Sequence, residues 1–258
     1  YVSNNQLQIL LEHKVIMADV RGDQVRALQA IHGVSKRETT LEAPYFVDAT
    51  ELGDLLPLSR TEYVTGTESK SHTRELHAPG KPDPTNNQSF TMCLAMDYVP
   101  GEDHTIEKPK NYDFWRTYVP KLAPAWSGRM LSLSYSNPRT LEPKSLGFHP
   151  EGVATGNDLN LWNYRKIINR HNFLLGSYVG DITIMNWPQN DYVLGNIVDV
   201  SEKEFNKHVA QAKQQSLSLF YWLQTEAPRP DSGQGWRGLR LRGDVLGTSD
   251  GLAKYPYV

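Results

Sequence analysis

The residues whose types and spacing best suit ligand binding are Asp48, Ala49, Thr50, Gly53 and Asp54. They follow the apolar stretch 45–47, which predicts a strand running into a buried sheet. In open α/β sheets, ligands collect beyond the carboxyl ends of strands, where a helix start offers the positive end of its dipole. An ordinary strand-to-helix turn, capped by Asp48 or Thr50, explains the same residues equally well.

A second polar cluster follows the apolar stretch 178–185, which also predicts a strand. Its donors, acceptors and aromatic faces come from Asn186, Trp187, Gln189, Asn190, Asp191 and Tyr192. So many polar groups after a buried strand form either a binding loop or a turn network that satisfies itself. We favour a binding loop, and the self-contained network is the alternative.

Three glycines, Gly233, Gly235 and Gly238, match the G-x-G-x-x-G pattern of dinucleotide-binding proteins. That pattern needs a buried strand before it and a helix after it, because the pyrophosphate sits on the helix N-terminus. Here 228–232 is rich in proline, and the alternation at 239–242 predicts a strand. We therefore interpret the segment as a glycine-rich loop.

Neither a metal site nor a nucleophile stands out. His72 and His77 are five positions apart in a polar stretch and lack the i, i+4 spacing of a metallopeptidase helix. Cys93 lies between Met92 and Leu94 and fits a small buried hydrophobe better than a reactive thiolate. We predict no metal and assign no catalytic base.

The triplet Arg-Gly-Asp occurs twice, at 21–23 and 242–244. Tight turns between strands favour glycine for steric reasons, so two polar turns explain both occurrences. Two exposed Arg-Gly-Asp turns would also suit a non-enzymatic ligand-binding or adhesive module. That module is the alternative class of function.

The composition limits the class of partner. The chain has 258 residues, of which 27 are basic and 29 acidic, giving a net charge of −2. Such a balance argues against a nucleic-acid partner, which normally requires clustered Lys and Arg. No apolar run approaches the roughly 20 residues needed to cross a bilayer, so we expect a soluble chain with no membrane partner. A single cysteine excludes an internal disulfide framework.

Three apolar stretches, at 10–17, 25–31 and 45–50, alternate with glycine-containing turns. This alternation predicts a three-stranded antiparallel meander whose last strand enters a buried sheet. The residues after it predict a short helix at 51–56, stopped by Pro57.

The clearest predicted helix is 202–224, because Ser201 and Glu204 form a capping box and apolar residues follow at helical spacing. Weaker patterns predict helices at 112–118 and 157–168 and strands at 90–96, 178–185 and 239–242. A length of 258 residues fits one large domain or two small ones.

Residues 45–58, Tyr-Phe-Val-Asp-Ala-Thr-Glu-Leu-Gly-Asp-Leu-Leu-Pro-Leu, resemble the second flavin-contacting segment of FAD-dependent oxidoreductases with a glutathione-reductase-type fold. In that family an apolar strand ends in Asp-Ala-Thr followed by Gly-Asp. The likeness continues at 100–107, 186–192, 224–230 and 251–257, and so covers essentially the whole chain.

The resemblance implies an α/β fold, with mixed α+β structure in the substrate part. A partial Rossmann-like FAD/NAD(P)-binding domain, with the meander and a return strand, would occupy 1–59. An inserted substrate domain would span 60–225, and 226–258 would return toward the FAD-binding domain. The family's N-terminal Gly-rich segment and C-terminal Arg-rich stretch have no counterpart here, so we expect a fragment that is inactive alone.

The resemblance also implies hydride transfer between an organic substrate and the cofactor FAD. It assigns the cofactor side to Asp48, Ala49, Thr50, Gly53 and Asp54, and we place a small-molecule substrate at 186–192. Six tryptophans and 13 tyrosines would suit a ring-bearing substrate, although scattered aromatic residues more often belong to the core.

Overall fold

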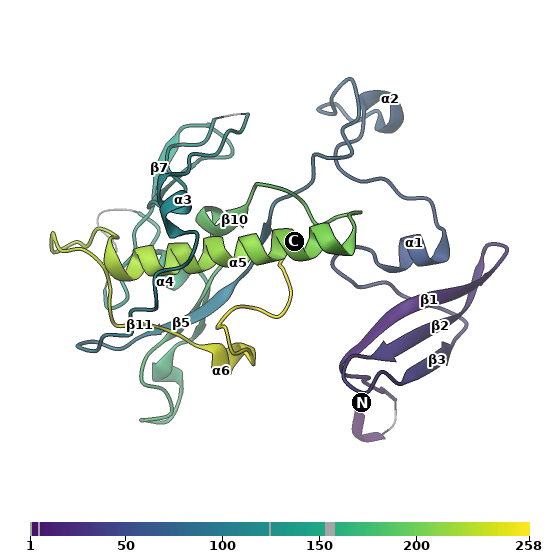
Figure 1. The fold of residues 1–258 in the computed structure, drawn as a ribbon, viewed down its shortest axis with the longest axis horizontal. Coiled ribbons are helices and arrows are strands. Elements are labelled where there is room, and N and C mark those ends of the chain that lie inside the picture. The colour runs from purple at the N-terminus through teal and green to yellow at the C-terminus, as the bar shows by residue number, and fades with distance from the viewer. Residues whose placement is uncertain (1, 5, 124, 153–157) are drawn as a thin grey trace. The chain divides into compact units, whose positions relative to one another are not determined.

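The computed structural model describes residues 2–4, 6–123, 125–152 and 158–258 (Figure 1). The chain forms two compact units, Tyr1–Asn86 and Asn87–Val258, and each is described by itself. The described part is a mixed α/β structure in which the paired strands run antiparallel. No helix among the described residues has the length and apolar character that a membrane crossing requires.

The first unit is built around an antiparallel meander, as the sequence predicts. Strands β1 (His13–Arg21), β2 (Gln24–His32) and β3 (Glu38–Glu42) pair in the order β1-β2-β3. Gly22 makes the first turn with φ +63°, a conformation that glycine adopts without steric penalty. Along β2, inward and outward side chains alternate and bury Leu28 and Ala30.

The third strand of the meander differs from the predicted one. Residues 45–50 form no strand, and the Tyr45 and Val47 side chains are 86% and 87% exposed. A strand needs a partner for its backbone groups, and no strand in the described part of the chain pairs with this segment. The prediction of a buried strand at this position was therefore wrong for this structure, and β3 closes the meander instead.

The short helix that follows begins later than predicted. Helix α1 (Leu55–Ser59) contains Pro57 as its third residue and lies beside β1. Proline is tolerated there because the first four N–H groups of a helix have no intrahelical partner. The helix ends at Arg60, which is left-handed with φ 59°. Two further short helical segments of this unit are η1 (Val2–Asn4) and α2 (Lys70–Thr73).

The second unit is organised by a four-stranded sheet in the order β11-β5-β9-β8. Its strands are β5 (Leu94–Tyr98), β8 (Lys166–Ile168), β9 (Ile182–Met185) and β11 (Leu239–Leu241). Two smaller pairs are β4 (Phe90–Thr91) with β10 (Asp191–Tyr192) and β6 (Ser134–Ser136) with β7 (Pro143–Ser145). The predicted strands at 178–185 and 239–242 are confirmed with shorter bounds, and the one at 90–96 is split into β4 and β5.

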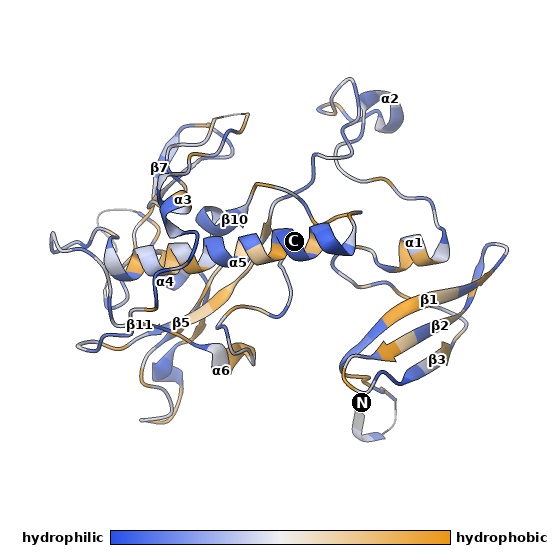
Figure 2. Ribbon diagram, in the orientation of Figure 1, coloured by the Kyte–Doolittle hydropathy of each residue, from blue (hydrophilic) through white to orange (hydrophobic). Residues whose placement is uncertain are grey.

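Helix α5 (Glu202–Thr225) runs along the length of this unit (Figure 1). The Ser201 hydroxyl caps it by accepting a 3.3 Å hydrogen bond from the Glu204 N–H, which confirms the predicted start. Apolar and polar residues alternate along the helix (Figure 2), and its buried face includes the small residues Ala212 and Ser216. The helix therefore buries one face and leaves the other to solvent.

The remaining helical segments are short. They are α3 (Tyr112–Thr117), α4 (Leu161–Tyr164), η2 (Arg170–Asn172), η3 (Pro188–Asn190) and α6 (Gly243–Leu246). The helix predicted at 157–168 is reduced to α4, and residue 157 lies outside the described residues. Asn160 caps α4 by accepting from the Trp162 N–H, and β8 then pairs with β9, because β-branched Ile167 and Ile168 suit a strand.

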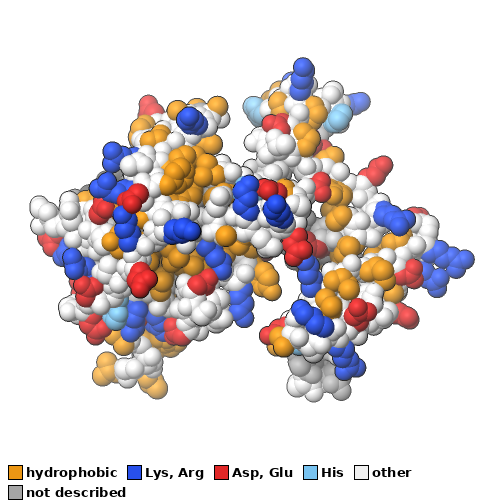
Figure 3. Space-filling model, in the orientation of Figure 1, with side chains coloured by type: hydrophobic (Ala, Val, Ile, Leu, Met, Phe, Trp, Pro, Cys, Tyr) orange, Lys and Arg blue, Asp and Glu red, His pale blue; other side chains and the backbone are white. Residues whose placement is uncertain are grey.

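A buried ion cluster fastens β11 to β5. The Asp97 carboxylate is fully buried and accepts from Arg240 Nε at 3.0 Å, Arg240 Nη2 at 2.6 Å and Arg242 Nη1 at 2.8 Å. Arg242 also contacts Asp244 through two hydrogen bonds. Elsewhere, basic and acidic side chains are interspersed over the described surface in view in Figure 3, as the near-neutral net charge suggests.

Candidate functional site

The first predicted site is a turn held together by its own side chains. Asp48 Oδ1 accepts from the Thr50 N–H at 2.9 Å and from the Thr50 hydroxyl at 2.7 Å, and Asp48 Oδ2 accepts from the Leu55 N–H at 2.8 Å. Thr50 Oγ1 accepts in turn from the Asp54 N–H at 2.8 Å. Asp48 and Thr50 therefore fix the entry to α1, as the capping alternative predicts.

Partial desolvation raises the pKa of Asp48, but the hydrogen bonds from Thr50 and Leu55 outweigh it and hold the pKa below 3.8. The Asp54 side chain makes no cap bond, and Ala49 and Thr50 are exposed. Gly53 is left-handed with φ +67°. The structure thus brings the five predicted residues into one turn on the surface of the first unit.

The second predicted site is a buried loop whose amides bond to the rest of its own unit. Asn190 Oδ1 accepts from the Trp187 N–H at 2.8 Å, and Asn190 Nδ2 donates to Ser216 Oγ at 3.2 Å. Gln189 Nε2 donates to the Ser134 carbonyl at 3.0 Å. In this structure the Gln189 and Asn190 amides therefore connect the loop after β9 with α5 and β6.

The other loop residues are also enclosed. Asn186 and Trp187 are 8% and 2% exposed, and Tyr192 is fully buried. The Tyr192 hydroxyl hydrogen-bonds to Gln211 Oε1 and lies 3.1 Å from His208 Nδ1, both on α5. The structure brings the six predicted residues together, but their assignment to a substrate stays a prediction.

Asp191 is the loop residue whose side chain is best suited to acid–base chemistry. Thr91 Oγ1 donates to Asp191 Oδ1 at 2.5 Å. Burial raises the pKa of Asp191 above 3.8, although the Thr91 hydrogen bond and then the Arg165 charge act to lower it. A buried carboxyl group with a raised pKa holds a proton more readily, as groups at functional sites commonly do. Asp191 is therefore the strongest candidate proton carrier of this loop.

Arg165 beside this carboxyl is a functional candidate that sequence reasoning missed. Its guanidinium lies over the rings of Tyr164 and Tyr257, 5.2 Å and 5.9 Å from their centroids. Its Nε atom is buried and has no hydrogen-bond partner among the described residues. An arginine on two aromatic rings keeps donors for a planar acceptor. The sequence around Arg165 does not indicate this role, because one of the two rings, that of Tyr257, lies 92 positions later in the chain.

Cys93 lies in the same neighbourhood. Burial raises the pKa of its thiol to about 11, while the Arg165 charge lowers it slightly. At neutral pH the thiol is therefore protonated and a poor nucleophile, as the sequence suggests.

The other motifs contribute little to a site. The Gly233–Gly238 segment lies between α5 and β11, so it lacks the strand and helix of a dinucleotide site. Across the described residues, no group of three His, Cys, Asp or Glu side chains is arranged to hold a metal ion.

Comparisons with known proteins give one finding that concerns the whole chain. Neither the curated proteins nor the solved structures contain a match to this sequence. The model of one protein family, described as FAD dependent oxidoreductase, matches residues 1–258. The chain therefore belongs to the FAD-dependent oxidoreductase family.

Proposed function

We propose that this chain takes part in the transfer of a hydride between an organic substrate and FAD. The observation that carries the proposal is the family match over residues 1–258. FAD supplies the redox chemistry when bound, and the protein supplies binding, orientation and electrostatics.

The turn at 48–54 offers groups that fit the cofactor. The Asp48 and Thr50 oxygens already bond within the turn. Among the described residues, no partner is found for the backbone amides of Ala49, Glu51 and Leu52. Hydroxyl and phosphate oxygens of a dinucleotide are acceptors that match such amides. Exposed Tyr45 and Val47 add apolar surface next to them.

Within this proposal, residues 1–59 belong to a Rossmann-like FAD-binding domain that carries the meander β1–β3. Residues 60–225 form a substrate domain, and 226–258 lead back toward the cofactor. The exposed segment 45–50, which forms no strand in this structure, is the part of this domain that the proposal places against FAD. A structure with FAD bound tests this division directly.

On the substrate side, the proposal uses Asp191 and Arg165. Gln189, Asn190 and Tyr192 bond to other parts of their unit, and Thr91 occupies Oδ1 of Asp191. The proposal therefore assigns the substrate to the second carboxylate oxygen of Asp191 and to the guanidinium of Arg165. Asp191 holds or accepts a proton of the reacting group, and Arg165 orients a polar group of the substrate.

The test is to express the chain, together with any coding sequence that flanks it, and to record its visible spectrum. We expect the absorption of oxidised flavin, with FAD released on denaturation. The variant Gly53→Val should reduce the FAD content, because its Cβ would meet the Leu56 side chain at 2.9 Å in a left-handed turn. Gly80→Ala is the matched control, since nothing lies within 4 Å of its added Cβ. A wild-type protein that is folded but colourless contradicts the proposal.

The adhesive alternative has weaker support. The first Arg-Gly-Asp triplet lies on the exposed turn between β1 and β2. In the second, the Arg242 side chain bonds to buried Asp97 and to Asp244, and Gly243 begins α6. The expectation of two exposed Arg-Gly-Asp turns was therefore wrong for the second triplet, because its arginine is an internal structural group.

A further inference from the structure

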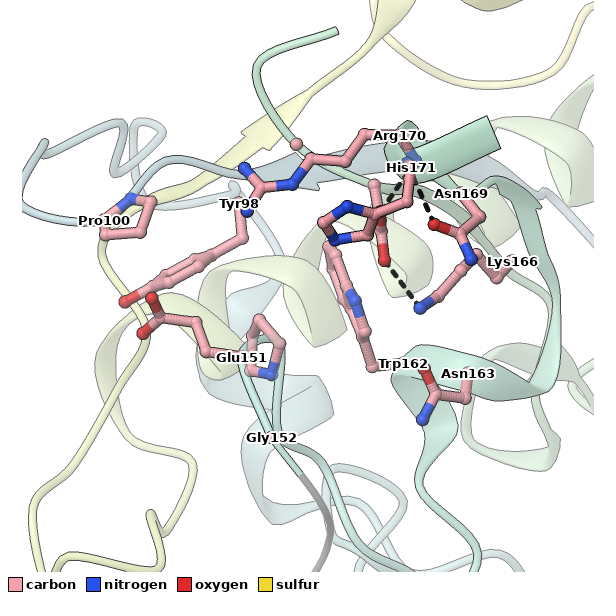
Figure 4. Close-up of a pocket in the computed structure, with 13 residues that line it drawn as sticks. Tyr98, Pro100, Glu151, Gly152, Trp162, Asn163, Lys166, Asn169, Arg170 and His171 are labelled. Atoms are coloured by element: carbon pink, nitrogen blue, oxygen red, sulfur yellow. Dashed lines mark hydrogen bonds and ion pairs between the residues drawn. The ribbon is translucent and has the colours of Figure 1, made fainter. Parts of the chain in front are cut away.

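The second unit contains a cavity of about 470 Å³ that neither predicted site includes. This volume lies within the range of small-molecule sites, roughly 300–1,000 Å³. Its lining includes Tyr98, Glu151, Trp162, Lys166, Arg170 and Asp181. Figure 4 shows Tyr98 and Glu151 on one side of the cavity, Lys166 on the other, and Trp162 between them.

One wall of this cavity is held in place by a buried asparagine. Asn160 Nδ2 donates to the carbonyls of His149 at 3.0 Å and Gly152 at 3.1 Å, and Asn160 Oδ1 accepts from the N–H groups of His149 and Trp162. These four bonds fasten the 149–152 segment to the start of α4. A wall fixed in this way is preorganised, which lowers the entropy loss on binding.

The opposite wall is held by an ion pair. Lys166 Nζ lies 2.6 Å from Asp181 Oδ2, and Asp181 Oδ1 accepts from the Arg170 N–H at 3.0 Å. Lys166 on β8 and Asp181, which directly precedes β9, therefore lock neighbouring strands together. Both oxygens of Asp181 are used in these contacts, so this carboxylate positions the cations.

Several polar groups of the lining keep hydrogen-bonding capacity. Lys166 has three donors and uses one on Asp181, and the Arg170 guanidinium makes one bond, from Nη1 to the Val179 carbonyl at 2.9 Å. Asn163 and Asn169 add amide groups on the same side. Glu151 supplies an acceptor next to Tyr98. Burial is the main cause that raises the pKa of Tyr98, and the negative charge of Glu151 raises it further.

The charges of the lining balance. Lys166 and Arg170 are cationic, and Asp181 and Glu151 are anionic, so the cavity has no strong preference for an ion. Donors and acceptors stand close to aromatic rings. A sugar hydroxyl both donates and accepts, and the C–H face of a sugar ring packs on an aromatic ring.

We propose that this cavity binds a neutral, hydroxyl-rich ring compound, a mono- or disaccharide, with its ring against Tyr98 and its hydroxyls on Arg170, Lys166 and Glu151. The proposal goes beyond the redox function and does not depend on flavin, because binding requires these residues alone. It holds or fails separately from the proposed oxidoreductase activity.

The test is saturation-transfer NMR on the 258-residue chain with D-glucose, D-galactose and maltose as probes, and with benzoate and sulfate as comparison ligands. We expect transfer to at least one neutral sugar and a change in the indole N–H signal of Trp162, assigned with Trp162→Phe. Absence of binding by all three sugars, or tighter binding of benzoate or sulfate, overturns the proposal.

Two variants locate the binding. Arg170→Gln and Glu151→Ala each remove a charged side chain at an exposed position, so both variants should fold. Each should lower the affinity for the sugar by about tenfold, as loss of a charge-assisted hydrogen bond does. Arg139→Gln and Glu142→Ala are matched controls, because these exposed residues do not line the cavity. If the variants and the controls lower the sugar affinity equally, while the spectra of the folded chain are unchanged, the sugar binds elsewhere and the proposal is contradicted.

Discussion

The Asp48–Leu55 turn and the 186–192 loop contain similar polar residues but are stabilised in different ways. In the turn, each side-chain hydrogen bond joins residues at most seven positions apart. In the loop, the bonds reach Ser216 on α5, 26 positions away, and Ser134, 55 positions away. The turn lies at the surface, whereas Gln189, Asn190 and Tyr192 are fully buried.

This difference shows why polar residues alone do not identify a binding loop. A local network satisfies its own groups and leaves neighbouring backbone amides available, as at Glu51 and Leu52. A buried loop must satisfy its groups against distant segments, because an unpaired buried polar group is costly. The substitutions below test whether the turn is local and dispensable for the fold and the loop is integral to it.

The largest effect is expected for Asn190→Ala. The change leaves the Trp187 N–H and the Ser216 hydroxyl without their partner at a fully buried position. Together with the weaker bond from Asn190 Nδ2 to the Met185 carbonyl at 3.4 Å, the variant loses three buried hydrogen bonds, which should lower the free energy of unfolding by about 3 kcal/mol. Chemical denaturation followed by tryptophan fluorescence measures it. Asn206→Ala, on the exposed side of α5, is the control and should change stability by less than about 0.5 kcal/mol. Equal effects would mean that the loop network is not integral to the unit.

A smaller effect is expected for Asp48→Ala. The variant loses three accepted hydrogen bonds, but the site is near solvent, so we expect a loss of about 1 kcal/mol confined to the first unit. Faster hydrogen exchange of the Thr50 and Leu55 amides reports it. Asp54→Ala is the matched control, because the Asp54 side chain makes no cap bond. A destabilised second unit in the Asp48 variant would show that the turn is not local.

The two carboxyl groups should respond to pH with opposite signs. Asp48 has a folded-state pKa below 3.8, so its contribution to stability is present above that pH and is lost as the pH falls through the folded pKa. Asp191 has a pKa above 3.8, so its contribution is present below pH 3.8 and is lost as the pH rises through the folded pKa. Carboxyl ¹³C NMR titration measures both. The stability difference from wild type should grow with pH for Asp48→Asn and shrink for Asp191→Asn, and the same sign for both would contradict this assignment.

The smallest effect concerns Arg165. Since its charge lowers the pKa of Asp191, Arg165→Met should raise that pKa further, while Arg165→Lys, which keeps the charge, should change it less. The same carboxyl titration distinguishes the two variants. An identical pKa in all three proteins would remove Arg165 from the surroundings of Asp191.

Features encoded locally were predictable from the sequence. The Ser201 cap of α5, the Asp48 turn and two of the three meander strands follow from residues close to one another in the chain. The other half of the predicted capping box does not form, because the Glu204 carboxylate contacts Lys207 instead. The third strand and the helix at 157–168 were misplaced, because sheet pairing rather than local propensity decides where β3 and β8 form. Arg165, Thr91 and Asp191 could not be linked, since they meet only through folding.

The Asp97 cluster limits how far the second unit can be shortened. Both of its cationic partners come from the last 19 residues, whereas the carboxylate lies on the inner strand β5. A polypeptide ending before Arg240 would enclose an uncompensated negative charge, which typically costs 3–5 kcal/mol, roughly a third of the stability of an ordinary domain. The smallest autonomous version of this unit therefore extends at least to Arg242.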